Sequence, residues 1–170
     1  LEDQSKFMKE LAKEGLSASK VMSDMASHSE FIAKYMKDGG DNMEAAAKYA
    51  ASLGMDLGVA ESMAEKLMDW ESSISAEMEA SMILGRSINL DKARSLAYTG
   101  EIEAMMREVK LQAGGEAEFA KMSVVQRQAL GDAIGLSGAQ LAEFIKTQDN
   151  EHKAAGKNFG VWGAVLGGLF

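Results

Sequence analysis

A glycine followed by an apolar residue and then by a hydrogen-bonding side chain recurs three times: Gly15-Leu16-Ser17, Gly54-Met55-Asp56 and Gly135-Leu136-Ser137. Glycine readily adopts the left-handed conformation that ends a helix, the apolar residue packs back on the last turn, and Ser or Asp caps the next helix. Gln140 also follows Ser137 at the spacing of a capping box. The pattern predicts helices joined by tight corners, as in helical hairpins or arrays.

Composition favours helices between these corners. The chain has no Pro, 13 Met and only 6% aromatic residues, whereas sheets are rich in aromatic and β-branched side chains. The hydrophobic share of 46% is sufficient for a folded core. We expect an all-α chain, with helices at about 18–37, 42–53, 57–84, 90–98, 101–113, 116–121, 124–134 and 138–153.

The longest predicted helix, 57–84, would extend roughly 40 Å at about 1.5 Å per residue. It carries an apolar stripe in which successive members lie three or four residues apart. This spacing favours a straight or slightly right-handed association between helices. Two interpretations remain open, an ordinary core face and a seam between copies of the chain. The stripe consists of Met63, Leu67, Trp70, Ile74, Met78 and Met82.

The pattern changes at the end of the chain, so we divide it into a helical region (1–145), a polar spacer (146–158) and an apolar glycine-rich tail (159–170). The tail is shorter than the roughly 20 residues that span a bilayer, but it contains a GxxxG pair that permits close helix packing. It is interpreted either as the start of a membrane-inserting segment or as a buried protein contact. Its characteristic residues are Phe159, Val161, Trp162, Gly163, Val165, Leu166, Gly167, Leu169 and Phe170.

The sequence contains no recognisable catalytic or cofactor motif. His28 and His152 lie among polar residues without a HExxH pattern, so we expect both to be solvated and not to bind a metal. The chain lacks Cys, phosphate-binding glycine motifs and a plausible base for a serine nucleophile. Glu77 and Glu79 are assigned to a charged helix face. We predict no enzyme activity, cofactor or metal, and the net charge of -8 argues against binding along nucleic acid.

Several segments, in the same order, resemble tail tape measure proteins of contractile-tailed bacteriophages. They lie between about residues 45 and 145, and their common features are helix boundaries and not chemical motifs. The resemblance therefore rests on the order of these segments and on how closely they follow one another in the chain. The segments are Ala51–Ala60, Asp69–Glu79, Gly85–Arg94, Glu118–Leu130 and Asp132–Ser137.

The resemblance implies a structural virion protein in the tail lumen, near the baseplate hub, that takes part in tail-length determination and in DNA passage into the host. It also implies a small oligomer, threefold in our interpretation, that contacts hub and tube proteins and reaches the host envelope after ejection. The corner carried over from the family comprises Gly85, Arg86, Asn89, Lys92, Ala93 and Arg94. Asn89 is predicted to cap a helix, and Arg86 to pair with a nearby carboxylate.

One departure from the family is length, because a chain of 170 residues cannot by itself set the length of a tail. A second function class also fits the pattern. The alternative is a membrane-active, pore-forming helical protein in which the apolar tail inserts into lipid.

Overall fold

The computed structural model describes residues 2–146, which are folded into helices with no strand among them. The prediction of an all-α fold is confirmed over this range. Residues 138–146 are also helical. The labelled elements are α1 (Glu2–Lys13), α2 (Ala18–Ser27), α3 (Ser29–Tyr35), η1 (Asp38–Gly40), α4 (Asp41–Ser52), α5 (Leu57–Met68), α6 (Trp70–Leu84), α7 (Asp91–Tyr98), α8 (Ile102–Ala113), α9 (Glu116–Lys121) and α10 (Val124–Ile134).

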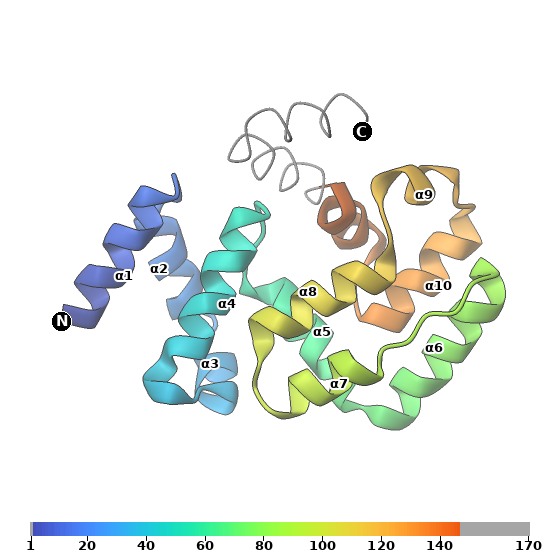
Figure 1. The fold of residues 1–170 in the computed structure, drawn as a ribbon, viewed down its shortest axis with the longest axis horizontal. Helices are drawn as coiled ribbons and strands as arrows, with labels where there is room; N and C mark the ends of the chain where they lie inside the picture. Colours follow the sequence, from blue (N-terminus) through green and yellow to red (C-terminus); the bar gives the residue numbers. More distant parts are fainter. Residues whose placement is uncertain (1, 147–170) are drawn as a thin grey trace, which may run out of the picture.

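Helix α5 lies at the centre of the molecule, and α1 lies at the opposite end from α6 and α10 (Figure 1). α5 contacts α4, α6, α7, α8 and α10, while α6 packs against α10 and α7 packs against α8. The sequence of α5 explains its central place, since its apolar residues form a broad face over nearly half of the helix. Its buried residues are Leu57, Val59, Ala60, Met63, Ala64 and Leu67.

The three glycine corners have the same local structure. Gly15, Gly54 and Gly135 have φ angles of 76°, 71° and 80°. After each glycine, the next backbone N–H donates to the carbonyl five residues earlier, as in the Leu136 to Gly131 bond of 2.9 Å. This bond is typical of a Schellman ending. The hydrogen-bonding residue then caps the following helix, for example where Asp56 Oδ1 accepts from the Gly58 N–H at 2.8 Å.

The prediction of one continuous helix over 57–84 is wrong. α5 ends at Met68 and α6 begins at Trp70, because Asp69 has non-helical angles of φ -87° and ψ 79°. Asp has a weak helix propensity and tolerates such conformations. The break allows the two helices to pack differently, since α5 contacts five helices whereas α6 leaves the centre to lie along α10.

The helix expected over 18–37 is also divided. α2 ends at Ser27 and α3 begins at Ser29, with His28 between them at φ -118° and ψ 36°. The backbone N–H and the ring Nδ1 of His28 both bond to the Asp24 carbonyl oxygen, at 3.1 and 2.9 Å. These bonds satisfy a carbonyl of the last turn and close α2 there.

The polar spacer and the apolar tail predicted for the C-terminal region remain predictions. Among residues 2–146, no helix is both long enough and apolar enough to cross a bilayer. The spacer beyond Lys146 and the apolar tail, with its GxxxG pair Gly163 and Gly167, lie outside the described residues.

Candidate protein-docking surface

The break at Asp69 divides the predicted apolar stripe into a core half and a surface half. On α5, Met63 and Leu67 are completely buried. On α6, the exposed fractions are 54% for Trp70, 41% for Ile74, 63% for Met78 and 83% for Met82. The stripe therefore belongs to the core as far as Leu67 and to the molecular surface beyond it.

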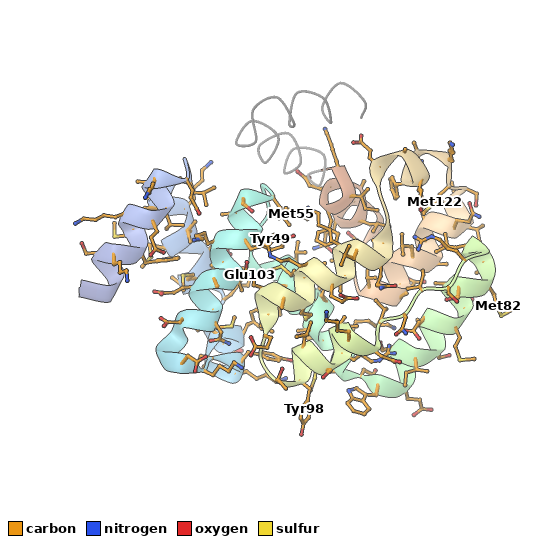
Figure 2. All side chains as sticks on the ribbon, viewed as in Figure 1. Tyr49, Met55, Met82, Tyr98, Glu103 and Met122 are labelled. Carbon is orange, nitrogen blue, oxygen red and sulfur yellow. The ribbon has the colours of Figure 1, made fainter. Side chains whose placement is uncertain are left out.

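The exposed half is extended by an aromatic residue of α7. Tyr98 is 69% exposed, and its ring centroid lies 6.5 Å from that of Trp70 in an edge-on arrangement. Figure 2 shows Tyr98 and Met82 projecting away from the ribbon at the two ends of this area. We refer to Trp70, Ile74, Met78, Met82 and Tyr98 as the α6 surface.

The polar neighbours of the α6 surface are arranged as a second row along the helix. Glu71, Ser75 and Glu79 are exposed, and each directly follows one apolar member in the sequence. The i, i+4 spacing keeps the members of each row adjacent. Single exposed apolar residues are common on protein surfaces, but a contiguous row bordered by polar groups is typical of a contact with another molecule.

Beside the exposed row, α6 is held to α7 by a buried arginine. Arg94 is only 4% exposed, and its Nη1 donates to Ser73 Oγ at 2.9 Å. Its Nη2 donates to Glu77 Oε1 at 3.0 Å, and that oxygen also accepts the Leu90 N–H. These bonds link the two helices that carry the α6 surface. The position of Tyr98 relative to Trp70 is thereby supported by a network that solvent scarcely reaches.

The family-like corner connects α6, α7 and α8. Gly85 ends α6 with φ 73°, and Arg86 donates to the carbonyl oxygens of Gln112 and Ala113 at 3.0 and 2.9 Å. These carbonyls belong to the last turn of α8, where acceptors lack helical partners. Arg86 Nε also lies 3.6 Å from a Glu118 carboxylate oxygen, the type of pairing expected from the sequence.

The remaining members of the corner have local structural contacts. Asn89 does not occupy the predicted N-cap position, which in α7 is Leu90, although its Oδ1 accepts the Asp91 N–H at 2.9 Å. Ala93 is buried, whereas Lys92 is exposed and its Nζ lies 3.8 Å from Glu108. The corner is therefore a connection within the fold.

The sequence did not indicate two residues of this region. Tyr98 was outside the predicted stripe, because its proximity to Trp70 depends on how α7 packs. Glu77 was assigned to a charged face with Glu79, although its side chain is only 14% exposed. The i, i+4 spacing of Ser73 and Glu77 places both on one side of the helix, but their arginine partner comes from another helix.

Comparison of the chain with protein-family models, with curated proteins and with solved structures finds no match.

Proposed function

We propose that this chain is a structural segment of a bacteriophage tail tape measure protein and that its copies associate through the α6 surface. The segment would lie in the tail lumen at the hub end and would contribute to tail-length determination and DNA passage. The single observation that supports association is the contiguous exposed row on α6. The family assignment rests on the sequence resemblance.

Copies of the chain are the occupant that fits the α6 surface best. The row has no positive charge among its exposed members, and the only exposed charges on α6 are Glu71 and Glu79 at its border. Copies related by a symmetry axis bring equivalent apolar rows together and leave the acidic row at the rim in water. A threefold arrangement, as the family implies, would place three α6 helices around the axis. A strongly acidic partner would instead be repelled by Glu71 and Glu79.

The net charge of -8 agrees with a protein that lets DNA pass. An acidic surface repels the phosphate backbone and does not retain it. We therefore propose contacts with copies of the chain and with hub and tube proteins, and no sequence-specific binding to nucleic acid.

A charge placed in the middle of the α6 surface is expected to separate the copies. In Met78→Glu the carboxylate would have to be desolvated at the centre of the contact. We expect the dissociation constant to rise by about 30-fold or more, equivalent to about 2 kcal/mol. Sedimentation velocity of the 170-residue chain over a series of concentrations measures this change.

Met8→Glu is the matched control, because Met8 is 44% exposed on α1, at the other end of the molecule. Its sedimentation should follow that of the wild type. A wild-type chain that stays monomeric at every concentration contradicts self-association. Equal weakening by the two substitutions shows that the α6 surface is not the contact.

The virion assignment has a separate test. Genes for tube and baseplate proteins beside the coding sequence, and peptides of this chain in purified tails, are the expected results. Their absence, combined with leakage of liposomes caused by the full chain, would support the membrane-active alternative in place of the tape measure role.

A further inference from the structure

A histidine and two carboxylates meet where the end of α2 approaches the start of α5. One ring nitrogen of His28 and one oxygen each from Asp24 and Asp56 lie within 4.8 Å of one another. Asp24 and His28 are partly buried, and Asp56 is exposed. The three side chains line an open hollow of about 490 Å³, to which Lys20 and several serines of α2 also contribute.

Two of the donors are close enough to share an ion after a small movement of the side chains. His28 Nδ1 lies 2.9 Å from Asp24 Oδ1. Ligands bound to one tetrahedral zinc ion at about 2.0–2.2 Å are about 3.3–3.6 Å apart, so these two atoms would separate by about 0.5 Å to admit it. Asp24 and His28 are four residues apart, which places both on one face at the end of α2. An ion between them would take the place of the Nδ1 proton and would therefore replace the bond from Nδ1 to the Asp24 carbonyl oxygen. The neutral ring would then carry its proton on Nε2.

The backbone fixes the position of the Asp24 carboxylate. Both of its oxygens accept from the Leu57 N–H, at 3.1 and 3.0 Å. Each carboxylate oxygen has two acceptor positions, so this contact leaves capacity for an ion. Asp56 is held less tightly, since its Oδ1 accepts only the Gly58 N–H among the bonds described. A small rotation of this exposed side chain would complete the donor set.

The electrostatics of the cluster favour a cation. Burial lowers the pKa of His28, but the Asp24 carbonyl and the negative charges of Asp24, Asp56 and Glu61 outweigh burial and raise the pKa overall. The pKa of Asp24 is raised, first by burial and then by the nearby Asp56, despite the opposing hydrogen bond from Leu57. Two carboxylates within 4.8 Å of the imidazole place excess negative charge at one point, and a divalent ion would neutralise it.

We propose that Asp24, His28 and Asp56 form a binding site for a divalent first-row transition metal, with Zn²⁺ as the probe. A single imidazole with two carboxylates suits such an ion better than Mg²⁺ or Ca²⁺, which prefer oxygen ligands alone. The ion would join the end of α2 to the first turn of α5 and so fasten the N-terminal helices to the centre of the fold. This site is independent of the α6 surface, so either can fail without the other.

The test is calorimetric titration of Zn²⁺ into the full chain after metal removal, without an affinity tag. We expect saturable binding of one ion per chain and a Tm that rises with Zn²⁺ concentration, because an ion that binds only the folded state stabilises it. His28→Gln and Asp56→Asn should each weaken the affinity by at least about 10-fold. Asp56→Asn retains an oxygen that caps α5, so this variant should remain folded.

The matched control is His152→Gln, which removes the only other histidine of the chain and should leave the affinity unchanged. A shift of the His28 Nδ1 resonance on addition of Zn²⁺ gives a direct readout of the ligand atom. The proposal is overturned if no saturable binding occurs. It is also overturned if both site variants bind as the wild type does, or if His152→Gln abolishes binding.

Discussion

Replacing Arg94 with Ala is expected to lower the free energy of unfolding by about 3 kcal/mol. The substitution leaves the largely buried Glu77 carboxylate without its cationic partner and Ser73 Oγ without its donor. Removing one member of a buried pair costs far more than removing an exposed pair, because the remaining charge stays desolvated. Urea denaturation followed by circular dichroism measures the change.

Lys92→Ala is the matched control, on the same helix and also beside a carboxylate. Lys92 is 73% exposed, and its ion pair with Glu108 at 3.8 Å should contribute less than about 1 kcal/mol. Arg94→Lys keeps the charge but lacks the planar group that donates to both Ser73 and Glu77. Its loss of unfolding free energy should therefore lie between those of the two Ala variants. If Arg94→Ala costs no more than Lys92→Ala, the buried network does not hold α7 against α6.

Gly135→Ala is expected to destabilise the fold by about 2–4 kcal/mol, and Gly54→Ala by about 1–2 kcal/mol. Both glycines have positive φ, so both variants bear the cost of a side chain in the left-handed region. Only at Gly135 would the new Cβ also meet α5, at 2.7 Å from the Ser62 carbonyl oxygen and 2.7 Å from Lys66 Cβ. At Gly54, nothing lies within 4 Å.

The same denaturation experiment distinguishes the two glycine variants. A larger loss for Gly135→Ala shows that the corner after α10 is docked against the backbone of α5. Equal losses for Gly135→Ala and Gly54→Ala would mean that only the positive φ, which the two glycines share, has an energetic cost and that the contact with α5 has none. Gly15→Ala, where the Cβ also meets open space, should behave like Gly54→Ala.

The Arg94 network also bears on the proposed assembly. α6 and α7 both contribute to the α6 surface, and the bonds from Arg94 join them. A surface that is rigid before association loses less conformational entropy when it binds. Loss of the network should therefore weaken association as well as folding, whereas Met78→Glu should affect association alone because Met78 is largely exposed.

The two helix breaks show where prediction from the sequence fails. At Asp69 and His28 the apolar periodicity continues through the break, and the chain has no Pro and no Gly at either position. Nothing in the local pattern therefore ends the helix. The His28 cluster was missed for a related reason, since Asp56 lies far along the chain from Asp24 and meets it only because the end of α2 approaches the start of α5.

The helical class and the glycine corners were determined by the sequence alone, because helix propensity, left-handed glycines and caps depend on residues a few positions apart. The tertiary structure decided which apolar residues are buried. Met63 and Met78 belong to the same periodic stripe, yet one is completely buried and the other is 63% exposed. It also decided the partner of Glu77 and the close approach of Gly135 to α5. The physical reason is that burial, buried ion pairs and backbone proximity arise where helices distant in sequence meet, and periodicity within one helix does not specify its neighbour.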